Sequence, residues 1–183
     1  MDNKADPSVL PLPASGLALD IVDDPLPDGG LHRLEMAMLK AVEGLTRWQA
    51  GCFEQVSSVP LTGAETTLLL LIGSGGRSKT IKELARATNR IDIPNIQYSL
   101  RKLASAGLTS KQGAGRSGVT YSLTAEGMRA SEKMHGLRQQ LLLQAVAGQP
   151  DLTGQLQGAA AALEELAELY GAASRQAEAK SEA

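Results

Sequence analysis

The chain has 183 residues, 43% of them hydrophobic, with a formal net charge of −2. This length suits one domain with helical extensions, and the apolar fraction is sufficient for a buried core. No apolar run reaches the roughly 18 residues that a membrane span requires, and the acidic N-terminus lacks a signal peptide's basic and apolar segments, so we expect a cytoplasmic protein without membrane contact.

The residues that usually hold disulfides and metals are scarce. Cys52 is the single cysteine, which excludes an internal disulfide. His32 and His135 are far apart in sequence and give no metal-ligand spacing. No carboxylate pair or nucleophile–base set emerges either, so we predict neither a cofactor nor an enzyme.

Residues 1–28 are predicted to form a flexible N-terminal arm. The segment contains five prolines and six aspartates, a composition that disfavours regular structure.

The pattern changes at Leu31, where a helix is predicted to run to Gln55. Its apolar residues step by three and four, as in a helix that packs along its length against another. This seam consists of Leu31, Leu34, Met38, Ala41, Leu45, Trp48 and Cys52.

Cys52 allows two interpretations. A lone thiol could sense redox state, as in some transcription regulators. Its place on the apolar stripe favours packing.

A second helix is predicted after Pro60. Thr62 and Glu65 have capping-box spacing, and the run from Leu68 to Ile72 is apolar on every side, which indicates a buried helix. The glycine-rich turn that follows lacks the Gly-Lys-Ser/Thr ending of a phosphate-binding loop.

A further capping box, formed by Thr80 and Glu83, predicts the start of the next short helix. Ile81, Leu84 and Ala85 share one face of this helix. A turn is expected at residues 89–90, where the apolar pattern stops.

The following helix is predicted to begin at Asp92, a favourable N-cap residue, with Pro94 in its first turn. Three apolar residues share its buried face: Ile96, Leu100 and Leu103. Polar or aromatic residues occupy the opposite face and its flanks: Asn95, Gln97, Tyr98, Arg101, Lys102 and Ser105. Gly107 is expected to end the helix.

Such a surface suits base reading. Asparagine and glutamine can pair with adenine, arginine with guanine, and lysine can neutralise a phosphate. Any amphipathic helix has a polar outer face, so a solvated surface is the alternative interpretation.

Two strands are predicted next, at 109–111 and 119–123, where the second alternates apolar and polar residues. The glycine-rich loop between them carries Arg116, close to Lys111. A projecting loop with these two cations could probe phosphates or a minor groove. A surface hairpin without function would look similar but would have less reason to carry cations.

Charge supports a polyanion site in this part of the chain. Residues 77–120 contain nine Lys/Arg and two acidic residues, a local balance of +7, so the remainder of the chain carries −9. A basic module in an acidic chain indicates a local binding site for a polyanion and not non-specific association of the whole chain.

The C-terminal third is predicted to contain two helices. Thr124 caps the first, which continues to about Val146 and stops at Gly148 and Pro150. Asp151 caps the second, which has another seam spaced by three and four. Its members are Leu152, Leu156, Ala159, Leu163, Leu166 and Tyr170. Residues 174–183 are predicted to form a disordered tail.

The order of these elements resembles the MarR family of bacterial transcription regulators, as do the segments TIKELARATNR, RKLASAGL and YSLTAEG. The resemblance is specific from Leu61 to Gly127 and architectural in the flanking helices. It implies a mainly α fold with a small β-hairpin wing, in which a winged helix-turn-helix is flanked by N- and C-terminal dimerisation helices. The winged core is 61–127 within a domain at 29–173.

The resemblance makes the segment from Pro94 to Lys102 the recognition helix. Together with the residue patterns above, it gives a set of candidate DNA-contacting residues. They are Thr80, Pro94, Asn95, Gln97, Tyr98, Arg101, Lys102, Lys111 and Arg116. The wing departs from the family's Asp-x-Arg pattern, because Gly115 and Ser117 stand at those positions with Arg116 between them. Arg116 therefore either takes over the groove contact in a shifted loop or leaves the wing contact weaker.

Members of that family often bind a small aromatic effector. The residues that could line such a pocket are Met38, Trp48, Phe53 and Met134, which are equally suited to core packing. The expected function is that of a homodimeric regulator on a pseudo-palindromic operator in double-stranded DNA, with the recognition helix in the major groove and the wing at the minor groove. The alternative is a winged-helix module that docks an acidic protein partner.

Overall fold

The computed structural model describes residues 30–113 and 118–181. The predicted N-terminal arm, Arg116 and the last two residues lie outside the described residues. The chain divides into two compact units, and the boundary between them falls after Arg138.

Five α-helices form the framework of the first unit. They are α1 (Leu31–Val56), α2 (Gly63–Gly73), α3 (Ile81–Ala87), α4 (Ile93–Ser105) and α5 (Ala125–Leu137). A short 3-10 turn, Ser74–Gly76, follows α2. The predicted helix at 31–55 is confirmed to within one residue.

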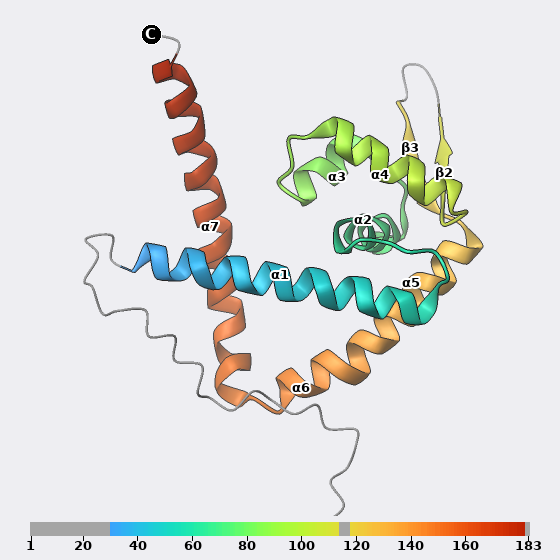
Figure 1. Ribbon diagram of the computed structural model, residues 1–183, viewed down its shortest axis with the longest axis horizontal. Helices are drawn as coiled ribbons and strands as arrows, with labels where there is room; N and C mark the ends of the chain where they lie inside the picture. Colours follow the sequence, from blue (N-terminus) through green and yellow to red (C-terminus); the bar gives the residue numbers. More distant parts are fainter. Residues whose placement is uncertain (1–29, 114–117, 182–183) are drawn as a thin grey trace, which may run out of the picture. The chain divides into compact units, whose positions relative to one another are not determined.

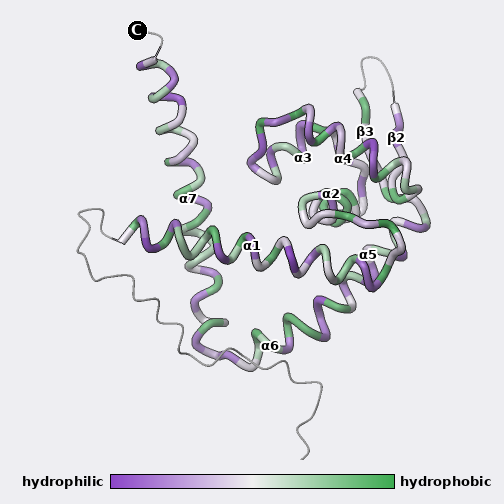
Figure 2. The backbone as a smooth tube through the Cα atoms, in the orientation of Figure 1, coloured by the Kyte–Doolittle hydropathy of each residue, from purple (hydrophilic) through white to green (hydrophobic). Residues whose placement is uncertain are grey.

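Helix α2 is the centre of the first unit. Thr62 and Glu65 form the predicted capping box, and Leu68 and Leu69 have no exposed surface. The helix contacts α1, α4 and α5, and Figure 1 shows it between α1 and the pair formed by α3 and α4. An apolar helix that is covered on several sides needs no polar stripe, which agrees with the white and green of α2 in Figure 2.

A three-stranded antiparallel sheet forms the wing and its base. Its strands are β1 (Lys79–Thr80), β2 (Thr109–Gln112) and β3 (Thr120–Leu123), in the order β1-β3-β2. The two-stranded hairpin expected from the sequence was therefore incomplete. Two polar residues such as those of β1 carry no alternating pattern from which a strand can be predicted.

The base of the wing is fastened to the start of α5. The Thr124 backbone N–H donates to the Leu108 carbonyl at 3.1 Å, and the Thr124 side chain accepts from Gly127 N–H at 3.1 Å, as predicted for a cap. A Cβ atom on Gly127 would lie 1.9 Å from the Leu108 carbonyl oxygen, so only glycine fits here.

The chain after α5 differs from expectation in three ways. The predicted helix to Val146 consists of α5, a π-helical segment at Arg138–Leu143 and α6 (Gln144–Ala147). Helix α6 ends at Ala147, and Gly148 is its C-cap residue, as predicted. Helix α7 (Pro150–Ser181) begins at Pro150, because proline fits the first helical turn without loss of a hydrogen bond. Asp151 therefore lies in the first turn of α7 and is not the N-cap that its sequence position predicts.

The predicted disordered tail is wrong as far as Ser181, which still belongs to α7. The segment is rich in Ala, Glu, Gln, Arg and Lys, all of which favour helix.

Within the second unit, α6 packs against α7. None of the α7 residues is buried, and green and purple segments alternate along this helix in Figure 2. Its predicted seam lies at the surface of the chain: Leu152 and Leu156 are each 45% exposed. No helix in the described ranges is long and apolar enough to cross a membrane.

Candidate nucleic-acid interface

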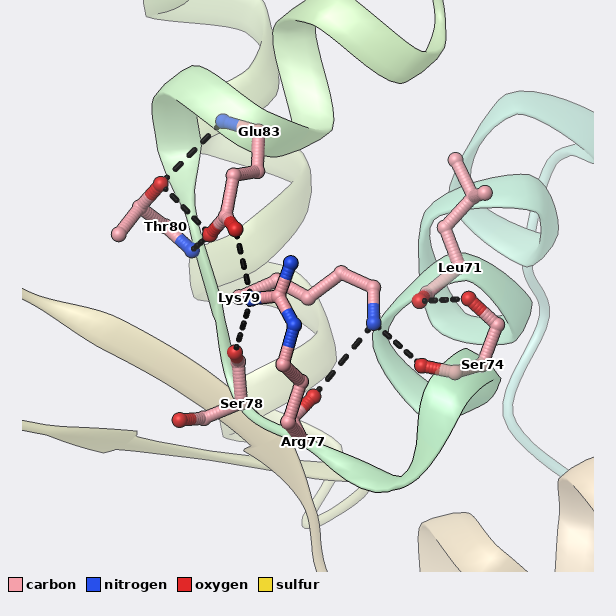
Figure 3. Close-up of polar contacts among 7 residues, drawn as sticks. All are labelled: Leu71, Ser74, Arg77, Ser78, Lys79, Thr80 and Glu83. Atoms are coloured by element: carbon pink, nitrogen blue, oxygen red, sulfur yellow. Dashed lines mark hydrogen bonds and ion pairs between the residues drawn. The ribbon is translucent and has the colours of Figure 1, made fainter.

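Helix α3 begins in a tight polar cluster, which Figure 3 shows. The Thr80 hydroxyl accepts from Glu83 N–H at 3.2 Å, and the Thr80 backbone N–H donates to the Glu83 carboxylate at 2.7 Å. Arg77 Nη1 lies 2.6 Å from Glu83 Oε1. The hydrogen bond from the Thr80 backbone and the one from Arg77 lower the pKa of Glu83 to about 2. The predicted capping box is confirmed.

These contacts use the polar atoms of Thr80. Its hydroxyl donates to the Glu83 carboxylate at 2.9 Å and also accepts from the helix backbone. In the same cluster the Lys79 ammonium donates to the Ser74 carbonyl. The DNA contact predicted for Thr80 stays a prediction, and its side chain already has a structural role.

A second charged cluster lies in the turn between α3 and α4. Asn89 adopts a positive φ of 50° there, a conformation that asparagine tolerates better than most residues. Arg90 then pairs with both oxygens of Asp92, at 2.8 and 2.7 Å. Asp92 stands at the predicted N-cap position, but its side chain makes no capping hydrogen bond. Its carboxylate instead accepts from Arg90 and from Asn95 Nδ2.

Helix α4 has the two faces that its sequence predicts. Ile96, Leu100 and Leu103 are at most 1% exposed. The opposite side is at the surface, where Tyr98 is 61% exposed. Several polar or small residues of α4 are also exposed: Pro94, Asn95, Gln97 and Arg101.

Lys102 differs from its neighbours on this helix. Its ammonium lies 2.7 Å from Glu65 Oε2, and the Glu65 side chain is 6% exposed. Burial alone would raise the pKa of Glu65, but hydrogen bonds from Lys102 and from the Thr62 backbone outweigh it and lower the pKa. The pair connects α4 to the capped start of α2. The phosphate contact predicted for Lys102 stays a prediction.

The wing presents one described cation. Lys111 is exposed on β2, where it pairs with Tyr121 of β3. Gly113 and Gly118 both have positive φ, and a Cβ on Gly113 would lie 2.4 Å from the Gly118 carbonyl oxygen. The backbones of the two glycines therefore approach each other closely, one at each end of the loop. Arg116, in that loop, lies outside the described residues.

The described lysines and arginines of the basic segment 77–120 therefore fall into two groups. Four have partners within the domain: Arg77, Lys79, Arg90 and Lys102. The side chains of four others are exposed and form no hydrogen bond or ion pair with any residue that the structure describes: Lys82, Arg86, Arg101 and Lys111. This division could not be predicted, because the sequence gives the charges without their partners in space.

A groove of about 360 Å³ separates α4 from the wing. Its floor is apolar, with Leu100 and Tyr121 nearly buried, and Arg101 and Lys111 are among its lining residues. Two of the free cations therefore border one concave surface. The sequence pattern placed them on separate elements and did not predict this juxtaposition.

The residues considered for an effector pocket lie mainly in the core. Phe53 and Met134 are at most 1% exposed, and Trp48 packs against the same core. Met38 is half-buried on α1. Cys52 is buried as well, and burial raises the pKa of its thiol, which supports the packing interpretation because the thiolate is the reactive form.

The described residues contain no group of three or more His, Cys, Asp or Glu side chains that could hold a metal ion. The exposed cations without a described partner lie on three neighbouring elements: Lys82 and Arg86 on α3, Arg101 on α4 and Lys111 on β2.

Residues 61–127 match the family described as winged helix DNA-binding domain. A search of curated proteins finds no match. Among solved structures, the chain is similar to a MarR family transcription regulator with a TM-score of 0.63 and 17% identity, over 77% of this chain and 93% of that chain.

Two similar structures contain DNA. The transcriptional repressor CouR, bound to a 23-mer DNA duplex, has a TM-score of 0.55 and 20% identity, over 79% of this chain and 98% of that chain. A mutant of MarR from E. coli, complexed with operator DNA, has a TM-score of 0.54 and 20% identity, over 73% and 97% respectively. The predicted fold class is confirmed, and the resemblance to the MarR family is confirmed at the level of the fold.

Proposed function

We propose that this chain, in which residues 61–127 form a winged helix DNA-binding domain within the fold of MarR-family regulators, is a homodimeric, sequence-specific transcriptional regulator. Helix α4 enters the major groove of an operator, and the wing approaches the adjacent minor groove. The observation that carries this proposal is the outer face of α4, because the polar side chains of Gln97, Tyr98 and Arg101 are exposed there without a partner among the described residues, on a helix whose inner face is buried.

Each group on that face has a suitable target on DNA. The amides of Asn95 and Gln97 can pair with adenine, and the free guanidinium of Arg101 can pair with guanine. Tyr98 and Pro94 add apolar contact area at the same surface. Base contacts of this kind specify a sequence, whereas phosphate contacts fix the position of the protein.

The free cations supply the phosphate contacts. Lys82 and Arg86 are exposed on α3, and Lys111 is exposed on the wing. We add Arg116 from the wing loop, as its sequence position predicts. Thr80 and Lys102 take structural roles in this proposal, because their polar atoms are used within the domain.

We further propose that the protein acts as a two-fold dimer through α1 and α7. Helix α1 exposes Leu39 at 63% and Val42 at 61%, and α7 has no buried residue. Large exposed apolar stripes of this kind usually mark an interface. A two-fold dimer would place two α4 helices about 34–36 Å apart, the spacing of adjacent major grooves, and would require a pseudo-palindromic operator.

We assign Trp48, Phe53 and Met134 to core packing rather than to an effector pocket, because all three belong to or contact the core of the first unit. Met38 is half-buried and belongs to the predicted apolar seam of α1, the helix that we propose for dimerisation.

Selection from a pool of random DNA duplexes, followed by fluorescence anisotropy with non-specific competitor at two salt concentrations, tests the proposal. We expect one sequence class to be enriched, to have two-fold symmetry and to survive competitor. Affinity should fall steeply as salt rises, because several phosphates are neutralised. Binding that vanishes with competitor at both salt concentrations would contradict a sequence-specific regulator and would favour docking of an acidic protein partner.

A further inference from the structure

Asp92 occupies a helix N-cap position without acting as a cap. Asp is common at N-caps because its carboxylate accepts hydrogen bonds from the free backbone N–H groups of the first turn. Here no such bond forms. The usual reason for an aspartate at this position is therefore absent.

The carboxylate is committed to two side chains instead. Arg90 Nε donates to Oδ1 at 2.8 Å and Arg90 Nη2 donates to Oδ2 at 2.7 Å. Asn95 Nδ2 donates to Oδ2 at 3.1 Å. The hydrogen bonds from Arg90 and Asn95 lower the pKa of Asp92 to about 2, so the group is ionised at neutral pH.

An ionised carboxylate can fix the orientation of a neighbouring amide. The oxygen and the NH₂ of an asparagine side chain have nearly the same shape, and a half-turn about χ2 exchanges them. A carboxylate only accepts hydrogen bonds, so it holds Nδ2 and repels Oδ1. Asn95 therefore keeps Oδ1 and its second Nδ2 hydrogen for other partners.

That pair of groups, one acceptor and one donor, matches the N6 and N7 edge of adenine in the major groove. We propose that Asp92 is a positioning residue for adenine recognition, because it locks the Asn95 amide in the orientation that reads this base. The inference rests on the proposed function and adds a residue that determines its specificity.

Arg90 makes such an arrangement compatible with DNA. An uncompensated carboxylate beside the recognition helix would repel the phosphates. The bidentate ion pair with Arg90, whose side chain is 25% exposed, compensates the negative charge of Asp92. The turn thus presents an oriented amide at little net charge.

The test uses the operator selected from random duplexes, with each adenine replaced in turn by 7-deazaadenine, which lacks the N7 acceptor. For the wild-type protein we expect about a tenfold loss of affinity at one adenine of each half-site. Asn95→Ala should abolish this loss at the same position. Asp92→Asn should reduce it to less than about threefold, because an amide at position 92 no longer favours one orientation of Asn95.

Arg90→Gln is the matched control. It removes the same ion pair and should lower thermal stability to a similar extent as Asp92→Asn, but it leaves the carboxylate beside Asn95. We expect it to retain the tenfold discrimination on the operator, even if overall affinity falls.

Three results would overturn the inference while leaving the proposed function intact. Asp92→Asn could keep the full discrimination between adenine and 7-deazaadenine, or Arg90→Gln could lose it as completely as Asp92→Asn does. The third such result is that Asn95→Ala keeps the discrimination at every adenine. If the wild-type protein enriches no sequence at all, the proposed function itself fails and the inference fails with it.

Discussion

At the scale of single residues, the charges of the candidate interface serve two separate purposes. Arg77, Arg90 and Lys102 each pair with an acidic residue of the same domain. Arg101 and Lys111 are free among the described residues and face solvent. A positive balance counted along the sequence therefore overstates the charge available to DNA.

Lys102 and Lys111 should respond differently to the same substitution. Lys102→Met removes the partner of the buried Glu65 carboxylate, and we expect it to lower the free energy of unfolding by about 1–3 kcal/mol, since the lysine is partly solvent-screened. Lys111→Met should leave stability nearly unchanged but reduce the slope of log affinity against log salt by about 1. Urea unfolding and anisotropy titrations measure the two quantities. A reduced slope for Lys102→Met, with stability unchanged, would show that this lysine contacts phosphate.

The ionisation of Glu83 should make the free energy of unfolding depend on pH in the acid range. Hydrogen bonds from Thr80 and Arg77 lower its pKa from 4.5 to about 2. A carboxyl whose pKa is depressed by folding stabilises the protein above its unfolded-state pKa, and this stabilisation is lost as pH falls through the folded-state value. We expect the free energy of unfolding to decrease as pH falls from about 4.5 to about 2, and Glu83→Gln to flatten that decrease in urea unfolding. An identical pH dependence in the variant would contradict this role.

At the scale of elements, the capped helices could be predicted because their signals are local. Thr62, Thr80 and Thr124 each accept a hydrogen bond from the first turn of the helix that they precede, as their spacing predicts. The buried and exposed faces of α4 follow from the same kind of local pattern.

Features that depend on distant partners could not be predicted in this way. Strand β1 exists because β3 pairs with it, and the ion pair of Lys102 joins residues 37 positions apart. Asp92 looks like a cap in sequence, but Arg90 and Asn95 bind its carboxylate. For the same reason the division of cations into paired and free groups required the structure.

The junction between the wing and α5 should be intolerant of a methyl group. Gly127→Ala would place Cβ 1.9 Å from the Leu108 carbonyl oxygen, so we expect destabilisation of about 1–3 kcal/mol or more. Gly136→Ala is the control in the same helix, because its Cβ would meet nothing within 4 Å. That variant should be neutral or more stable by up to about 1 kcal/mol. Equal thermal shifts in the two variants would contradict the close contact.

For the protein as a whole, we expect that a second copy of the chain covers helix α7. Helix α7 is 32 residues long with no buried residue, and isolated helices rarely gain enough stability from propensity alone. Its seam residues are apolar and regularly spaced, which suits another helix. We therefore expect two chains per particle in solution.

Two alanines of α7 give a matched test of this expectation. Ala159 belongs to the predicted seam, whereas Ala161 lies about 200° further around the helix, on the opposite face. Both are exposed in the single chain. Ala159→Lys should shift the mass measured by sedimentation equilibrium from two chains toward one, and Ala161→Lys should leave it at two. The same shift in both variants, or in neither, would contradict a dimer formed through this seam.

A binding profile of Arg101→Ala tests directly whether the outer face of α4 reads DNA sequence. Affinity is measured for the selected operator and for every single-base-pair variant of it, beside the wild-type protein. We expect a loss of about 1–3 kcal/mol in binding free energy on the operator and the loss of preference at one base pair in each half-site, with the other positions unchanged. A profile that is uniformly weaker, or that is identical to the wild type, would contradict this role of α4.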